Sequence, residues 1–192
     1  MAKGQAIGLQ RVGGQVPAAV RIGFGWQAAS RRGLFGSRTR EIDLDASAVL
    51  FADRQPVDVV FFRHLASDDG SVRHTGDNLV GGGGGVVGAG GDEESILVDL
   101  QRVPVHIDQI VFTVNSFTGR TFQEVQSAFC RIVDETDGQE LARCTLNGGG
   151  QYTAQIMAKV HRSGSGWQMT AIGNPANGRT FQDLMPAILP HL

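Results

Sequence analysis

Several features that mark specialised protein classes are scarce in this sequence. Of its 192 residues only two are cysteines, Cys130 and Cys144, and their spacing fits neither a disulfide framework nor a zinc cluster. No run of about eighteen apolar residues occurs that could cross a membrane as a helix, and the first residues lack an apolar segment of signal-peptide length. We therefore expect reduced, partly buried thiols, no transmembrane segment and a cytoplasmic location.

An excess of charge of one sign is also missing. The formal net charge at pH 7 is −2, whereas proteins that bind nucleic acids or anionic membranes usually carry a clear positive excess. Hydrophobic residues make up 41% of the chain, a share that is ordinary for a soluble globular protein and too high for a disordered one. We expect one domain over residues 1–192, and nucleic acid is not an expected partner.

Short runs rich in valine, isoleucine and phenylalanine recur along the chain, separated by glycine, aspartate and asparagine. Examples are VDVVFFRHL, SILVDL and QIVFTVNSF. Strands of this length with frequent turns are typical of a β-sandwich. Asp69-Gly70 and Asp137-Gly138 are predicted to form hairpin tips, because these turns need positive φ angles that glycine adopts readily. The expected fold class is all-β, a sandwich of two antiparallel sheets with a few short helices.

Two segments are predicted to be helical. Thr121 and Thr180 each stand three residues before a carboxylate, Glu124 and Asp183 respectively, as in a capping box. After Thr180, apolar residues recur at helical spacing, which predicts a short amphipathic helix near the end of the sequence. The basic segment 28–40 is predicted to be a loop before a strand that begins at Glu41.

No arrangement typical of hydrolytic catalysis stands out. Such catalysis needs a nucleophile beside a base, or a metal with a bound water. Cys130 lies in the apolar run AFCRIVD, Cys144 has no histidine near it in the sequence, and no Gly-x-Ser-x-Gly elbow occurs. The five histidines are scattered without metal-ligand spacing, although His74 stands beside a glycine-rich segment. We therefore expect that the protein is not an enzyme.

Three acidic elements could carry chemistry: Asp43-Leu44-Asp45, Gly76-Asp77-Asn78 and Asp92-Glu93-Glu94. Alternate side chains of a strand share a face, so Asp43 and Asp45 would point the same way and Leu44 the other. Two carboxylates about 7 Å apart along a strand repel each other unless a cation or a donor lies between them. Calcium suits such a place, because it takes six to eight oxygen ligands in irregular geometry.

The acidic and glycine-rich segments do not match two common motifs. A helical calcium loop starting at Asp43 would need glycine where Ala48 stands and glutamate where Arg54 stands. No Gly-Lys-Ser/Thr follows the glycines, so the tract is not a phosphate-binding P-loop. Taken singly, Asp77-Asn78 could form an Asx turn and Asp92 could cap a turn.

Five segments nevertheless follow one another in a distinctive order: DLDASAVLF, DGSVRHTGDNLVGGGG, GDEESILVDLQRVP, IDQIVFTVNSF and FQEVQSAFCRIVDE. In order and spacing they resemble the TerD family of bacterial tellurium-resistance and stress proteins, over about residues 18–173. The resemblance implies a two-sheet sandwich that binds Ca²⁺. It also implies the ligands, with side chains and two backbone carbonyls contributed by Asp43, Asp45, Asp77, Asn78, Asp92, Glu93, Leu79 and Gly81.

The glycine tract departs from the family pattern. VGGGGGVVGAGG is longer than the family's usual TGxGDGDDE loop and lacks its internal aspartate. Because calcium affinity follows ligand charge, we expect one site in place of two, or a weakened pair.

The function that the resemblance implies is that of a non-enzymatic calcium-binding stress-response protein linked to tellurite resistance, acting with other proteins of a stress-response complex. A metal-free interaction or scaffold module of the same fold is the alternative. A small anion or nucleotide held by the glycine amides is a third possibility, which the neighbouring acids disfavour.

Overall fold

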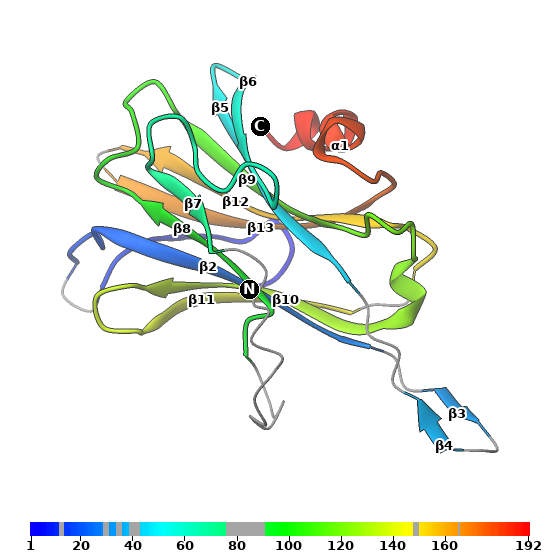
Figure 1. The fold of residues 1–192 in the computed structure, drawn as a ribbon. Helices are drawn as coiled ribbons and strands as arrows, with labels where there is room; N and C mark the ends of the chain where they lie inside the picture. The colour runs from blue at the N-terminus through cyan, green and yellow to red at the C-terminus, as the bar shows by residue number, and fades with distance from the viewer. Residues whose placement is uncertain are drawn as a thin grey trace.

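The computed structural model describes residues 1–11, 14–28, 31–33, 36–38, 43–75, 91–147, 150–164 and 166–192. These residues form two antiparallel sheets packed face to face (Figure 1), which confirms the predicted all-β sandwich. None of the helices in this part of the chain is long and apolar enough to cross a membrane.

The larger sheet has six strands, and every neighbouring pair is antiparallel. Their order across the sheet is β1 (Ala6–Gly8), β13 (Gly166–Ala176), β12 (Ala154–Ser163), β9 (Gln109–Asn115), β5 (Asp45–Ala52) and β6 (Gln55–Val60).

The second sheet has five antiparallel strands. Their order is β11 (Glu140–Asn147), β10 (Val125–Asp134), β2 (Ala19–Ala28), β8 (Glu94–Asp99) and β7 (Val72–His74). A separate hairpin of β3 (Arg31–Gly33) and β4 (Gly36–Arg38) projects from the sandwich (Figure 1). The prediction of a loop over 28–40 was therefore wrong in part, because this basic segment pairs with itself. Glu41 lies outside the described residues, and the described strand begins at Asp45.

The hydrophobic core lies between the two sheets, and the two-residue period of the strands builds it. Ile22 and Phe24 of β2 have no exposed surface, and Gly23 between them faces the other way, since a Cβ added there would meet Asp92. The ring of Phe24 meets that of Phe112 on β9, with centroids 6.3 Å apart, so the contact crosses from one sheet to the other. Burying an apolar side chain of this size contributes about 1.5–3 kcal/mol.

A second apolar cluster covers the outer face of the six-stranded sheet. Its strand residues include Val49 and Phe51 of β5, and α1 (Phe181–Ile188) packs on them through Leu184 and Ile188. The helix begins at the predicted capping box, with Asp183 accepting the N–H of Thr180 at 3.1 Å. A short 3₁₀ turn, η2 (Leu189–His191), follows it.

The other predicted local features have mixed outcomes. Gly70 and Gly138 have φ angles of +70° and +74°, as the predicted turns require. The second predicted capping box yields only one 3₁₀ turn, η1 (Phe122–Glu124), because Thr121 makes no side-chain cap and the chain enters β10 directly.

Cys130 and Cys144 are free and buried, opposite each other on β10 and β11. Burial raises the pKa of both thiols.

Candidate functional site

The predicted alternation of the Asp43-Leu44-Asp45 segment is confirmed. Leu44 and Ala46 are buried in the core between the sheets, whereas Asp43 is exposed and Asp45 half-buried. Ser47 and Val49 continue the face of Asp45, and Val49 belongs to the outer cluster. Asp45 therefore lies on the outer face of the six-stranded sheet, at the first residue of β5.

Asp45 lines a cleft of about 230 Å³ at the N-terminal end of α1. Asn115 lies opposite Asp45 in the strand register and donates from Nδ2 to the carbonyl of Arg179 at 2.7 Å. Aromatic rings form much of the remaining lining, together with two arginines: Phe61, Phe62, Phe117, Phe181, Arg63 and Arg179. Carboxylate and amide oxygens of Asp45 and Asn115 thus stand side by side at the edge of an aromatic cleft, and they are of the type that Ca²⁺ prefers.

Glu94 connects this strand to the other sheet. β6 pairs with β5 only from Ala48 onward, so the N–H of Ala46 lies beyond the paired stretch. That N–H donates to Glu94 Oε2 at 2.6 Å, and the Glu94 side chain is 4% exposed. A buried acceptor of this kind satisfies a backbone donor that would otherwise lose its hydrogen bond on leaving water.

His74, at the end of β7, stands beside the same carboxylate. Its Nε2 lies 3.4 Å from Glu94 Oε2, and its side chain is 1% exposed. Just after it, Thr75 donates from both its N–H and its hydroxyl to the carbonyl of Ser95, at 3.0 and 3.1 Å. Thr75, the last described residue before position 76, is therefore anchored at the start of β8, where Glu94 accepts the N–H of Ala46 on β5.

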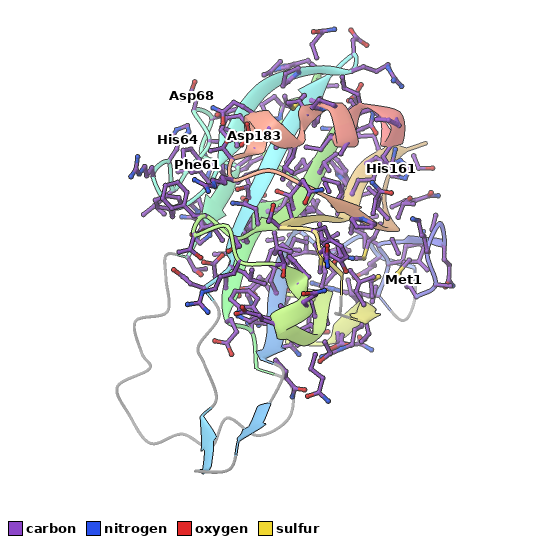
Figure 2. The ribbon with its side chains drawn as sticks, turned by 90° about the vertical axis from the view of Figure 1, so that its right-hand side faces the viewer. Met1, Phe61, His64, Asp68, His161 and Asp183 are labelled. Carbon is purple, nitrogen blue, oxygen red and sulfur yellow. The ribbon has the colours of Figure 1, made fainter. Side chains whose placement is uncertain are left out.

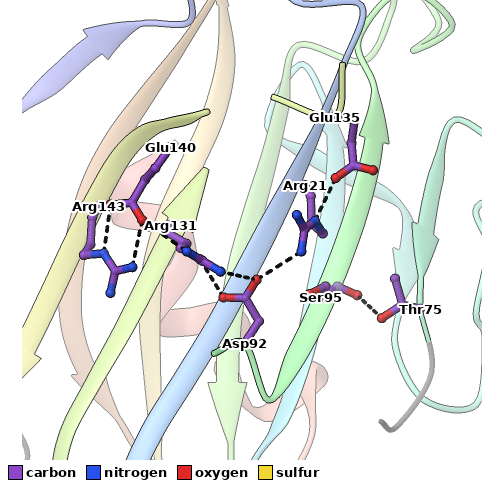
Figure 3. A network of polar contacts seen from close by, with 8 residues as sticks. All are labelled: Arg21, Thr75, Asp92, Ser95, Arg131, Glu135, Glu140 and Arg143. Atoms are coloured by element: carbon purple, nitrogen blue, oxygen red, sulfur yellow. Dashed lines mark hydrogen bonds and ion pairs between the residues drawn. The ribbon is translucent and has the colours of Figure 1, made fainter. Parts of the chain in front are cut away.

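Asp92 has a different environment, on the outer face of the five-stranded sheet. Arg131 donates to its carboxylate from Nε at 2.7 Å and from Nη2 at 3.1 Å, and Arg21 donates at 3.4 Å (Figure 3). The side chain fits there because β2 carries glycine at position 23, where an added Cβ would come within 2.2 Å of Asp92. Glu140 and Glu135 extend the same ion-pair network (Figure 3).

The predicted ligands are thus only partly described. Asp43 and Asp45 lie together at the start of β5, whereas Asp92 is engaged by two arginines. Glu93 is exposed, and its N–H pairs with the carbonyl of Phe24 at 2.7 Å. The other predicted ligands lie outside the described residues: Asp77, Asn78, Leu79 and Gly81. These ligand assignments stay predictions.

Sequence reasoning named Glu94 only as part of an acidic element, noted His74 only for its position, and missed Asn115. A signal for Glu94 was present, because it shares the two-residue period of Ile96 and Val98, both core residues. An acid on the buried face of a strand needs a partner inside the protein. Nothing in the sequence indicated which backbone N–H that partner would be.

Among the described residues, one further group could hold a metal ion. One ligand atom each of Asp58, His64 and Asp68 lie within 4.8 Å of one another. The Asp58 carboxylate accepts the N–H groups of Val59 and Asp68, at 2.7 and 2.8 Å. The Asp68 side chain is 94% exposed. These hydrogen bonds of Asp58 stabilise the chain after β6, and this role accounts for the close approach of the three side chains.

The comparison with known families now adds to this geometry. The family model described as "TerD domain" matches residues 1–186. The chain belongs to the TerD domain family. Tellurium resistance protein TerZ of Serratia marcescens is 38% identical over 188 residues, covering 96% of this chain and 93% of that protein. Stress response protein SCP2 of Bacillus subtilis (strain 168) is 35% identical over 197 residues, covering 95% of each.

A solved structure of the TerD family shows the same fold. The crystal structure of a homologue of telluride resistance protein (TerD) from Streptomyces coelicolor A3(2) superposes with a TM-score of 0.63, at 20% identity. The superposition covers 88% of this chain and 95% of that one. The TerD sandwich is thus retained although most residues differ.

Proposed function

We propose that this TerD-family chain is a calcium-binding stress-response protein linked to resistance against tellurium compounds, and that it acts by binding without catalysis. The names of the relatives support the stress role, since they include a tellurium resistance protein and a stress response protein that match it over more than nine tenths of its length. We place it in the cytoplasm, where it would work with other proteins of a stress-response complex.

The observation that carries the calcium proposal is the bond from Ala46 to Glu94. It ties the start of β5, where Asp43 and Asp45 lie, to the start of β8, where the acidic segment re-enters the sandwich. Side chains on both sides of this bond supply oxygen, the donor type that calcium prefers. Asp43 and Asp45 supply carboxylate oxygens at the start of β5, whereas Asp92 fits poorly, because its oxygens accept bonds from Arg131 and Arg21.

Asp43 and Asp45 would hold the ion, and Asp77 and Asn78 are the ligands expected from segment 76–90. Calcium, when bound, would offset the repulsion between these carboxylates. Glu94 acts as a positioning residue, because it holds the backbone beside Asp45 through the N–H of Ala46. The resulting surface at the start of β5 would be the one presented to partner proteins.

The proposal of binding without catalysis rests on the thiols, the strongest nucleophiles among the side chains of this chain. Both are buried, and burial raises the pKa of each. The nucleophilic thiolate is therefore disfavoured at neutral pH.

A metal-free interaction module remains the second candidate function. It is favoured by one observation, the engagement of Asp92 by two arginines, which leaves one fewer carboxylate for a metal. In that case the aromatic cleft beside Asp45 would serve as a binding surface without an ion.

Growth of a strain lacking this gene on tellurite, after complementation, tests the proposal. We expect wild type to restore growth and Asp45→Asn to fail, since the substitution removes one ligand charge. Asp53→Asn is the matched control: it lies in the turn after β5 and has a positive φ of 48°, which asparagine tolerates. Full rescue by Asp45→Asn would favour the metal-free module, and no rescue by wild type would reject the link to tellurium.

A further inference from the structure

The chain has only two lysines, Lys3 and Lys159. Both line one cleft, with a volume of about 440 Å³, together with His161 and His191. The other lysine or arginine side chains of the sequence are arginines, 15 of them, and none of those whose side chains the structure describes lines the cleft. Two lysines more than 150 positions apart have thus been brought to the same place by the fold.

The strand register explains the floor of this cleft. Lys159 and His161 of β12 stand opposite Thr170 and Gln168 of β13, respectively. The residues that alternate with them, Ala158 and Val160 on β12 and Met169 on β13, are buried in the core between the sheets. The four polar side chains therefore project from the outer face of the six-stranded sheet.

The walls come from the two terminal segments of the described chain. On one side Lys3 is positioned by Gly4, whose N–H donates to the carbonyl of Ala171 at 2.7 Å. On the other side stands His191 of η2. Figure 2 shows α1 between His161 and the labelled pair Phe61 and His64. This cleft and the aromatic cleft at Asp45 thus lie at opposite ends of α1.

The lining has the charge and the donors of an anion site. Of the described residues that line it, none carries a carboxylate. Lys159 Nζ donates to the carbonyl of His191 at 2.7 Å and to Gln109 Oε1 at 2.8 Å. An ammonium group has three N–H donors, so one remains. Lysine and imidazolium N–H groups bind anionic oxygen through short, charge-assisted hydrogen bonds.

Burial and the neighbouring positive charges both act on the pKa values of these groups. Burial lowers the pKa of His161 and of His191, and nearby Lys159 lowers both further, as Lys3 does for His191. Burial and Arg54 lower the pKa of Lys159, against the opposing effect of Asp108. An anion in the cleft would offset this repulsion and raise these pKa values.

We propose that this cleft binds a small, doubly charged oxyanion of the phosphate class. The anion is either free or the terminal group of a small metabolite, since the cleft also has apolar walls at Ala6 and Ile172 and falls in the usual size range of small-molecule sites. Lys3 and Lys159 supply the charge, and Gln168 supplies a further donor. His161 and Thr170 line the site while bonded to each other, with His161 Nε2 3.1 Å from Thr170 Oγ1. The site is separate from the proposed calcium site and does not depend on it.

Histidine side-chain NMR of the full chain, titrated with sodium phosphate and with adenosine monophosphate at constant ionic strength, tests this proposal. We expect the signals of His161 and His191 to shift, while those of His64 and His106, which do not line the cleft, stay in place. Shifts with phosphate alone identify a free oxyanion as the ligand, and tighter binding of the nucleotide identifies an organic phosphate. The absence of saturable shifts with either probe overturns the proposal.

Variants separate a specific site from general attraction of anions. Lys3→Ala removes an exposed lysine and should raise the dissociation constant about tenfold, the loss expected for one charge-assisted bond. Lys159→Met should do at least the same, although it also removes two internal bonds. Arg73→Gln removes the same charge from an exposed position on β7 and should leave binding unchanged. Equal losses in Lys3→Ala and Arg73→Gln would overturn the proposal. Repeating the titration with and without Ca²⁺ keeps the outcome independent of the calcium site.

Discussion

Asp92 and Glu94 are two residues apart, yet they lie in opposite environments. Asp92 lies on the outer face of the five-stranded sheet between Arg131 and Arg21. Glu94 points into the sandwich, where it accepts the N–H of Ala46 and stands beside His74. A strict two-residue period would put both acids on one face. They differ because the regular strand begins only at Glu94.

The difference separates acids that stabilise the fold from acids that could coordinate a metal ion. Two guanidinium groups already offset the charge of Asp92, so an added cation there would have to displace them. At the start of β5, Asp43 is exposed to solvent and Asp45 lines a cleft. The calcium proposal therefore depends on the β5 aspartates, with Glu94 holding their backbone in place.

The largest effect should come from Glu94→Ala. It leaves the N–H of Ala46 buried without its acceptor, at a cost of about 1–3 kcal/mol. For a protein of this size each kcal/mol lowers Tm by about 2–4 °C, which thermal unfolding can resolve. Glu94→Gln keeps an acceptor oxygen, so its Tm should fall less than that of Glu94→Ala. Equal stability of Glu94→Ala and wild type would show that Glu94 does not join the sheets.

A third acid, Asp134, extends the comparison to pH. It is fully buried and paired with Arg11, whose hydrogen bond holds the pKa of the carboxyl below its ordinary value. A lowered folded-state pKa gives stability that is complete above the unfolded pKa of about 3.9 and is lost as pH falls through the folded pKa. Unfolding free energies of wild type and Asp134→Asn, measured against pH, should differ at neutral pH and converge in acid. A difference that persists unchanged in strong acid would contradict this role.

The smallest effect should come from Asp92→Asn. The arginines beside it are partly exposed, with side-chain exposures of 33% for Arg21 and 21% for Arg131, so water can replace the lost pairing. We expect a loss of about 1 kcal/mol or less and unchanged calcium affinity by calorimetric titration. A marked loss of calcium affinity would mean that Asp92 leaves its arginines to bind the ion, as the family resemblance implies.

The fold was predictable to a large extent from local signals. Runs of β-branched residues, Gly70 and Gly138 at the turns, and the capping box at Thr180 each act over a few residues, and each was confirmed. Thr121 carried the same capping pattern, but the buried Phe122 and the strand that follows leave room for a single turn. Tertiary context thus overrode the local signal.

The candidate sites were less predictable, because they depend on which segments meet. Register brings Asn115 opposite Asp45, and the packing of the sheets brings Glu94 to Ala46. The cleft around Lys3 and Lys159 brings together Lys3, strands β12 and β13, and His191 of η2. No spacing in the sequence encodes these contacts.

Thermal unfolding of metal-stripped protein, with and without saturating Ca²⁺, tests the central claim most directly. At a hundredfold excess of calcium over its Kd, binding adds about 2.7 kcal/mol, or a rise in Tm of roughly 5–10 °C. We expect this rise in wild type and in Asp53→Asn, and its loss in Asp45→Asn and Asp77→Asn. An unchanged Tm in wild type, or a rise that survives both Asp45→Asn and Asp77→Asn, would contradict a calcium site at the start of β5.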